Sequence, residues 1–139
     1  MSVERTLCII KPDSLEKRVQ GAILQQLLDE GFEVLAMRQL VMTQAMAEAF
    51  YEVHRERPFY ADLVKFMTRG PVIVIALRRE NAVEQYRKVI GATDPSRAEP
   101  GTIRHKYGSS VGENAVHGSD SVDNGIRETN FFFPEHLLV

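Results

Sequence analysis

The chain has little cysteine, no excess of charge of either sign and no long apolar run. Its one cysteine, Cys8, excludes an intramolecular disulfide and favours a reducing compartment, so we expect a cytoplasmic protein. The formal net charge of −2 gives no support for a general nucleic-acid or membrane-surface role. No apolar stretch is long enough to span a bilayer, and the N-terminus lacks the apolar core of a secretory signal.

Two nucleotide-binding loops are absent as well. The chain contains neither G-x-x-x-x-G-K-[ST] nor G-x-G-x-x-G, so it does not hold nucleotides as P-loop or dinucleotide-binding enzymes do. It also lacks a dense cluster of cysteine and histidine for a structural metal. What is present is the composition of an ordinary globular protein, with 44% hydrophobic and 26% charged residues. The 139 residues suit one domain, residues 1–139, with a sizeable core.

Apolar runs and helical spacings alternate along the chain. Apolar runs predict strands at 6–10, 32–41, 72–77 and near 115–116. Apolar residues at helical spacing predict helices at 23–28, 43–54, 60–67, 81–90 and 120–128. The expected N-caps are Thr43, Asn81 and the Ser119-Asp120 pair. Strands that alternate with helices favour, by pattern alone, a parallel doubly wound sheet.

Two segments fit neither pattern. Residues 92–113 contain three glycines and two prolines with little apolar periodicity, which predicts a long irregular loop. Basic residues and Thr93 within it favour a functional loop. The tail Phe131-Phe132-Phe133-Pro134 is too apolar to be left in solvent, so we expect it to dock on the body of the protein or on another subunit.

The segment 114–120, Asn-Ala-Val-His-Gly-Ser-Asp, carries the most chemistry. A neutral imidazole keeps one lone pair free near neutral pH, which makes His117 a candidate nucleophile. Gly118 removes side-chain bulk beside the ring, so that a large charged substrate has access. If strand, turn and helix fold back, Glu128 can accept a hydrogen bond from the second ring nitrogen. The spacing leaves open that Glu128 is instead a solvated carboxylate at a helix end.

Other residues suit a phosphorylated substrate. Lys11 follows the first strand, where a cation can neutralise charge on a transferring phosphoryl group. Arg87 and Arg104 can clamp phosphate oxygens. Tyr51 and His54 lie three apart on a predicted helix and therefore share a face. Taken alone, Arg87 is explained as an exposed helix residue and Lys11 as a solvated strand end; together with His117, they indicate phosphoryl transfer through a phosphohistidine.

Over nearly the whole chain, these residues resemble the nucleoside diphosphate kinase family. The most specific motif is Asn114-Ala115-Val116-His117-Gly118-Ser119-Asp120-Ser121. The other landmarks, in chain order, are Ile10-Lys11-Pro12-Asp13, Tyr51 with Arg57-Pro58-Phe59, Gly70-Pro71-Val72, Gly91-Ala92-Thr93-Asp94-Pro95 and Gly101-Thr102-Ile103-Arg104.

The resemblance implies a fold and a reaction. The fold is a ferredoxin-like βαββαβ sandwich of the α/β (α+β) class, with an antiparallel sheet covered by helices. The reaction is ping-pong transfer of the γ-phosphoryl group from a nucleoside triphosphate, typically ATP, to a nucleoside diphosphate. His117 is the implied phosphorylated nucleophile, with Glu128 and Ser119 supporting it. Lys11 and Tyr51 are expected near the reacting phosphoryl group.

The resemblance also implies how the nucleotide is held. Lys11 and Asn114 contact the sugar 3′-hydroxyl, and the base lies between Phe59 and Val111, where stacking tolerates any base. The residues expected to hold the diphosphate are His54, Arg87, Thr93 and Arg104. Any Mg²⁺ is expected to be held mainly by the nucleotide phosphates. Family members form homo-oligomers, so we expect a hexamer first and a tetramer second, with no membrane and no specific nucleic-acid partner.

The chain departs from the commonest family pattern at Ser14 and at Asp123-Asn124-Gly125, which replaces a more helix-favouring, alanine-rich stretch. Ser14 stands where glycine or alanine is usual, and we expect no large effect. Gly125 lies inside the helix that carries Glu128 and should cost about 1 kcal/mol relative to alanine, which puts the stiffness of that helix in doubt.

Two other classes of protein remain as alternatives. A phosphocarrier or histidine phosphatase would also use His117, but Lys11, Asn114 and the Phe59/Val111 pair suit a nucleoside. A noncatalytic regulatory or nucleic-acid-binding module on a ferredoxin-like sheet would need a basic, aromatic-studded face, which the net charge of −2 disfavours.

Overall fold

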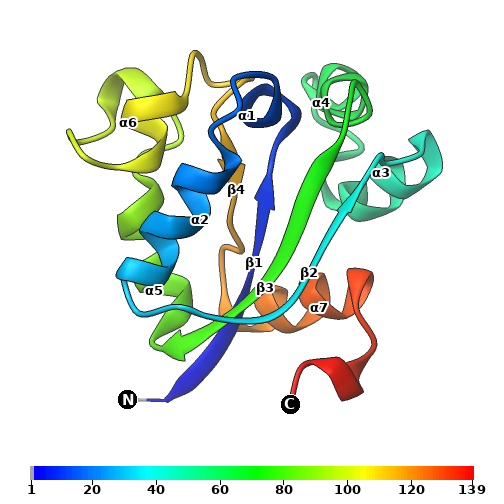
Figure 1. The fold of residues 1–139 in the computed structure, drawn as a ribbon. Helices are drawn as coiled ribbons and strands as arrows, with labels where there is room; N and C mark the ends of the chain where they lie inside the picture. The colour runs from blue at the N-terminus through cyan, green and yellow to red at the C-terminus, as the bar shows by residue number, and fades with distance from the viewer. Residues whose placement is uncertain (1) are drawn as a thin grey trace.

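Four strands form one antiparallel sheet in the computed structural model, which describes residues 2–139 (Figure 1). The strands are β1 (Val3–Ile10), β2 (Glu33–Leu40), β3 (Val72–Glu80) and β4 (Val116–His117), in the order β2-β3-β1-β4. β1 pairs antiparallel with β3 and β4, and β2 pairs antiparallel with β3. This is the ferredoxin-like arrangement that the resemblance implies, and the parallel sheet favoured by pattern alone is wrong.

The prediction of a parallel sheet is wrong because a helix that joins two strands sets their relative direction, but it does not decide whether the two strands pair with each other. β1 and β2, joined by α1 (Pro12–Glu16) and α2 (Gln20–Asp29), do run in the same direction, since both are antiparallel to β3. β3 lies between them, and the chain reaches it through α3 (Gln44–Phe50), the 3₁₀ helix η1 (Glu52–His54) and α4 (Tyr60–Met67). The α3–α4 pair thus replaces the hairpin turn of a simple antiparallel connection.

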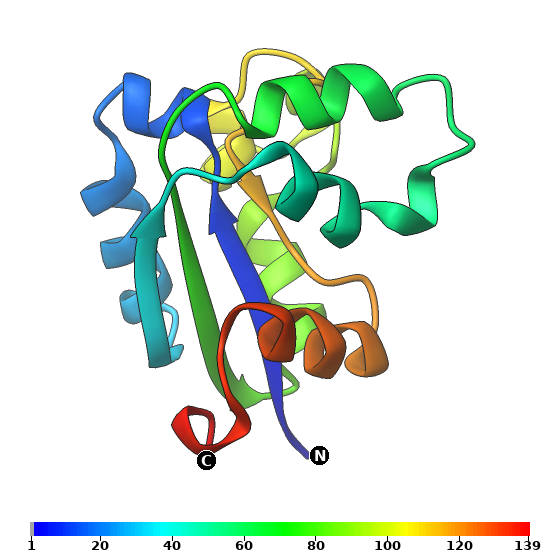
Figure 2. The ribbon, with the colours of Figure 1, turned by 90° about the vertical axis from the view of Figure 1, so that its right-hand side faces the viewer.

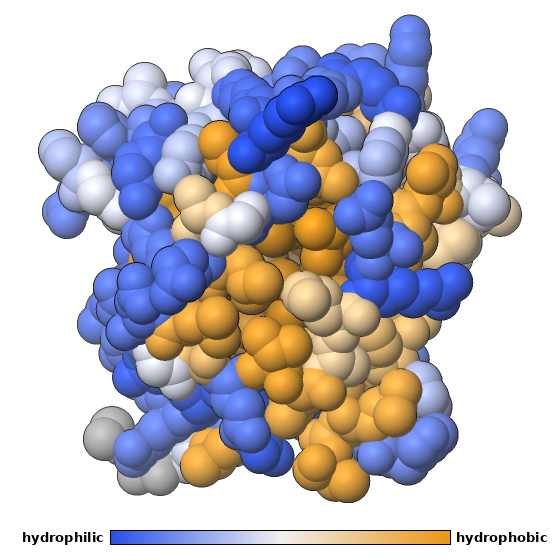
Figure 3. Space-filling view, viewed as in Figure 1, coloured by the Kyte–Doolittle hydropathy of each residue, from blue (hydrophilic) through white to orange (hydrophobic). Residues whose placement is uncertain are grey.

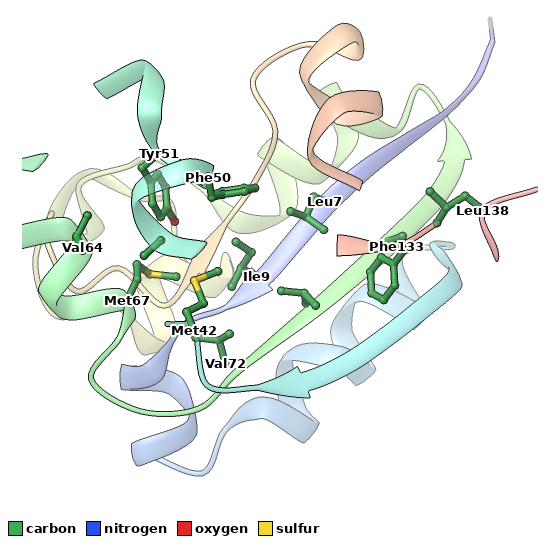
Figure 4. Close-up of a cluster of buried hydrophobic side chains, with 13 residues drawn as sticks. Leu7, Ile9, Met42, Phe50, Tyr51, Val64, Met67, Val72, Phe133 and Leu138 are labelled. Carbon is green, nitrogen blue, oxygen red and sulfur yellow. The ribbon is translucent and has the colours of Figure 1, made fainter. Parts of the chain in front are cut away.

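Helices cover both faces of the sheet, and each face has its own core. Because side chains of a strand alternate between faces, Leu7 of β1 joins the core under α3 and α4 (Figure 4), whereas Cys8 packs against α2 and α5 (Ala82–Ile90). Figure 1 shows α2 and α5 on one side of the sheet, and Figure 2 looks onto the other side, where α3, α4 and α7 (Val122–Phe132) lie. In residues 2–139, none of the helices has the length and apolarity needed to cross a membrane.

Two of the three predicted N-caps differ in the structure. Thr43 caps α3 as expected, because its side chain accepts a hydrogen bond from a backbone amide of the first turn. Asn81 precedes α5 with a positive φ of 55°, and its side chain makes no capping hydrogen bond. α7 is capped by Ser121 rather than by Ser119 or Asp120. The Ser119 hydroxyl is therefore free for a different partner.

The segment 92–113 is more regular than the loop its composition predicts. It contains the 3₁₀ helix η2 (Pro95–Arg97) and the short helix α6 (Ile103–Tyr107), which Thr102 caps. The apolar tail docks on the body of the protein, one of its two expected locations. Phe133 is buried in the core beneath α3 and α4, whereas Phe131 is 38% exposed.

α7 lies close against β1, and Gly125 permits this approach. A Cβ on Gly125 would lie 2.4 Å from the carbonyl oxygen of Arg5. The Arg5 side chain adds hydrogen bonds to Thr129 and Asn130 of α7 and to Glu135 beyond it. The glycine is thus a packing requirement in addition to its expected propensity cost, because alanine at this position would meet the backbone of β1.

We therefore expect Gly125→Ala to destabilise the protein by about 1 to 3 kcal/mol, because the new methyl group overlaps a backbone oxygen that cannot turn away. Gly21→Ala is the matched control: Gly21 lies in α2 with nothing within 4 Å of its added Cβ, so the better helix propensity of alanine should stabilise the protein by up to about 1 kcal/mol. Urea unfolding of both variants measures the difference. Equal stabilisation by the two substitutions would show that α7 moves away from β1 without cost.

Candidate active site

A cavity of about 960 Å³ opens between the α3–α4 pair and the loop 108–114 with the start of α7. Every predicted site residue except Ser119 lines it: Lys11, Tyr51, His54, Phe59, Arg87, Thr93, Arg104, Val111, Asn114, His117 and Glu128. Lining residues that the sequence analysis did not single out include Phe50, Arg69 and Arg127. Segments from both halves of the chain thus line the same cavity.

His117 is paired with a carboxylate at the cavity wall. Its Nε2 lies 2.8 Å from Oε1 of Glu128, and the hydroxyl of Ser119 donates to the same oxygen at 2.8 Å. Burial opposes ionisation of Glu128, but the hydrogen bonds and the charge of His117 hold its pKa below the ordinary value. An ionised carboxylate only accepts, so when the imidazole is neutral Nε2 carries its one proton and Nδ1 keeps the free lone pair. Glu128 is therefore not a solvated helix end.

Two aromatic side chains hold the imidazole from the α3 side. The ring of Phe50 meets that of His117 edge-on, with centroids 5.4 Å apart, and Tyr51 does so at 6.3 Å. The Tyr51 hydroxyl is buried and has no hydrogen-bond partner within residues 2–139. Burial first, and the charge of Glu128 second, raise the pKa of Tyr51, so it remains a hydroxyl donor. A buried donor without a partner at a cavity wall suits a polar ligand.

Lys11 places a cation on the cavity floor, where β1 ends. Its Nζ donates to Oδ1 of Asn114 at 2.8 Å, and the amide of Asn114 donates to the Thr93 carbonyl at 3.1 Å. Burial, with a smaller contribution from Arg104, lowers the pKa of Lys11 to about 8, while Asp13 opposes the shift. The pairing leaves ammonium protons available for an anion in the cavity.

The turn before the histidine is strained and firmly held. Ala115 has a φ of 76°, a costly value for a residue with a Cβ. Its amide donates to Oδ2 of Asp13 at 3.1 Å, and its carbonyl accepts from the Ser14 hydroxyl at 2.9 Å. Ser14 is fully buried, and its hydroxyl therefore helps to hold the turn before His117, a role that the sequence analysis did not assign to it. Asp13 belongs to the Lys11-Pro12-Asp13 motif, which is the one sequence signal that pointed to it.

Arg104 is only partly free to clamp phosphate. Its guanidinium donates to the backbone carbonyls of Gly91, Asn114 and Val116, at 3.1, 3.3 and 2.9 Å. These bonds use three of the five N–H groups of an arginine. Arg87 and Thr93, by contrast, are exposed on the cavity wall.

The outer walls carry the residues expected at the base. Phe59 and Val111 are 49% and 57% exposed and both line the cavity. Tyr51 and His54 share a face, but they belong to the end of α3 and to η1 rather than to one helix. Their rings stack at 6.5 Å, and His54 lies 5.4 Å from Phe59.

Arg69, which follows the end of α4, links this helix to α1 and to the loop 108–114. It bonds both carboxylate oxygens of Glu16 on α1, with the closest contact at 2.6 Å, and both oxygens of Glu113 in the loop, at 3.3 Å. Its guanidinium also lies over the ring of Phe66, 4.9 Å from the centroid. Each ion pair is partly exposed, but paired bidentate contacts in one network fix the loop better than isolated surface pairs do.

Fold and site together define an α+β phosphotransferase of ferredoxin-like architecture. The nucleoside diphosphate kinase family model matches residues 4–138, and the chain belongs to this family. It is 56% identical to the nucleoside diphosphate kinase of Sorangium cellulosum over 96% of this chain and 92% of that one. It is 48% identical to that of Salinibacter ruber over 100% and 98%. The crystal structure of the Aquifex aeolicus enzyme matches with a TM-score of 0.96 at 42% identity, covering 99% of this chain and 100% of that one.

Proposed function

We propose that this chain transfers the γ-phosphoryl group of a nucleoside triphosphate to a nucleoside diphosphate through a phosphohistidine on His117. The observation that carries the assignment is the pairing of Nε2 with Glu128 at the wall of the cavity. The Nδ1 lone pair attacks the γ-phosphorus, the bond from phosphorus to the bridging oxygen breaks, and the diphosphate leaves with that electron pair. A terminal oxygen of the second diphosphate then attacks phosphorus, and the N–P bond breaks.

The surrounding residues have roles that their positions support. Lys11 neutralises charge on the transferring phosphoryl group, the buried Tyr51 hydroxyl donates a hydrogen bond to it, and Lys11 with Asn114 bonds the sugar 3′-hydroxyl. Phe59 and Val111 enclose the base. The residues proposed to hold the diphosphate are His54, Arg87, Thr93 and the remaining donors of Arg104.

We propose that a divalent cation binds at this site as a partner of the nucleotide. Residues 2–139 contain no group of three or more His, Cys, Asp or Glu side chains placed to hold a metal ion. Mg²⁺ prefers to keep water and phosphate ligands, so we propose that the nucleotide phosphates hold it. When bound, the cation would neutralise phosphate charge, and Lys11 and Arg87 line the same cavity as further positive groups for the phosphates.

A two-step exchange tests the proposed reaction. The protein is incubated with ATP labelled in the γ-phosphate and separated from nucleotide, and the acid-labile phosphoprotein is then given GDP. We expect stoichiometric label on the protein and its transfer to GTP. Label that passes only to water would indicate a phosphatase, and label that passes only to another protein would indicate a phosphocarrier. The absence of any label would refute the proposed function.

Loss of the Lys11 charge should limit activity at alkaline pH. Because the pKa of Lys11 is lowered to about 8, the free enzyme loses this cation as the pH rises through that value. We expect kcat/KM for ADP to fall about tenfold between pH 7 and 9, in line with the protonated fraction. Lys11→Arg stays charged throughout, so its profile should be flat over this range even if its activity is lower. The same decline in that variant would assign the alkaline limb to another group.

We further propose a cytoplasmic homo-oligomer, a hexamer first and a tetramer second. β2 is an edge strand with exposed side chains such as Met37, and Figure 3 shows apolar side chains gathered across the face that carries it. Edge strands and apolar patches are the usual sites of subunit contact. Sedimentation at micromolar concentration tests this, and an active, stable species of 15.7 kDa would refute it.

A further inference from the structure

The backbone before the nucleophile is well held, because Asp13 and Ser14 bond Ala115 and Arg104 bonds the carbonyl of Val116, but these contacts stop short of the peptide that follows His117. β4 is only two residues long, and it is preceded by the strained Ala115 and followed by Gly118. Its register pairs His117 with Ile9 of β1. Phe50 and Glu128 hold the imidazole, but they do not hold the backbone from which it projects. The direction of the Cα–Cβ bond of His117 therefore depends on contacts to the main chain.

Tyr86 supplies such a contact from the opposite face of the sheet. It lies on α5 and is fully buried, and its hydroxyl donates to the carbonyl oxygen of His117 at 2.7 Å. The next residue, Arg87, lines the cavity. Because burial raises the pKa of Tyr86 well above its ordinary value, the hydroxyl keeps its proton throughout the working pH range.

The ring of Tyr86 is fitted against the residue after the nucleophile. A Cβ on Gly118 would lie 2.5 Å from Cε2 and 2.8 Å from Cδ2 of this ring. Phe32 packs edge-on against the ring from another side, with centroids 6.0 Å apart. Gly118 is thus required by the tyrosine beneath it, and not only by access for the substrate. One side chain contacts both ends of the peptide that joins His117 to Gly118.

We propose that Tyr86 is a positioning residue for the phosphorylated histidine. Its hydroxyl fixes the plane of the peptide that joins His117 to Gly118, and its ring supports that peptide from below. The imidazole is thereby held in line with the γ-phosphate while Phe50 and Glu128 orient the ring itself. This inference rests on the proposed role of His117, because it concerns the geometry of attack rather than the binding of nucleotide.

The test compares Tyr86→Phe with Phe32→Leu. The first removes only the hydroxyl, and the second loosens the packing of the ring while leaving the hydroxyl in place. For Tyr86→Phe, we expect the single-turnover rate of phosphoenzyme formation at saturating ATP to fall about tenfold, as small misplacements of reacting groups do, with KM within about twofold of the parent. The pH profile should keep its shape, because position changes and charge does not. Phe32→Leu should lower the unfolding midpoint at least as much, yet keep the parent rate.

The outcomes separate this inference from the proposed function. An unchanged rate in Tyr86→Phe, with normal phosphorylation of the parent protein, overturns the positioning role alone. An equal fall of rate in Phe32→Leu also overturns it, because general loosening would then explain both. If the parent protein itself forms no acid-labile phosphoenzyme, the proposed function has failed instead.

Discussion

Replacing His117 with alanine is expected to abolish nucleotide exchange while preserving the fold and ADP binding. The ring forms a covalent bond to phosphorus, and no neighbouring group substitutes for it, so exchange should fall by more than about a thousandfold. The fold should persist because Glu128 keeps a hydrogen bond from Ser119 and a charge contact with Arg127 at 3.5 Å after the imidazole is gone. The measurements are the steady-state rate, the circular dichroism spectrum and the affinity for ADP by calorimetry.

His105→Ala is the matched control for this variant. His105 lies on α6, is exposed and does not line the cavity, so its loss should leave the exchange rate unchanged. Residual nucleotide exchange above a few per cent in His117→Ala would refute the phosphohistidine mechanism. A normal rate together with a missing phosphoenzyme would point to direct transfer between two bound nucleotides.

The second large effect is expected from the sugar rather than from the base. ADP, GDP and CDP should react at rates within about tenfold of one another, because a stacking slot offers every base a similar surface. 3′-Deoxy-ADP should react about a hundredfold more slowly, since Lys11 and Asn114 would face a ligand that lacks their hydroxyl partner. The comparison requires only the acceptor to be changed, with ATP as a constant donor.

Asn114→Ala shows whether the sugar effect comes from this pair. The variant should lose activity on ADP while losing little on 3′-deoxy-ADP, so that the ratio between them narrows. Equal rates for CDP and 3′-deoxy-ADP with the parent protein would refute the assignment of Lys11 and Asn114. An unchanged ratio in the variant would leave Lys11 as the only residue of the pair that recognises the sugar.

Local patterns in the chain predict several elements closely. The helix expected at 60–67 is α4 (Tyr60–Met67), and the apolar run at 72–77 lies within β3 (Val72–Glu80). The secondary structure of these segments follows from local sequence, because an amphipathic spacing or a continuous apolar run is recognised without reference to distant residues. The N-caps were less predictable, because a serine or asparagine at a helix start can bond to other groups. Ser119 does so with Glu128.

The sequence by itself determined the family and the kinds of side chain at the site. The motif around His117 and the motifs before it are contiguous stretches of residues, so they are recognised without knowledge of the fold. Only the tertiary structure decided which residues meet. Asp13 accepts a hydrogen bond from the amide of Ala115, 102 positions away, Gly125 lets the backbone of Arg5 pack against α7, and the hydroxyl of Tyr86 donates to the carbonyl of His117. Such contacts follow from the order of strands and the packing of helices, and periodicity along the chain encodes neither.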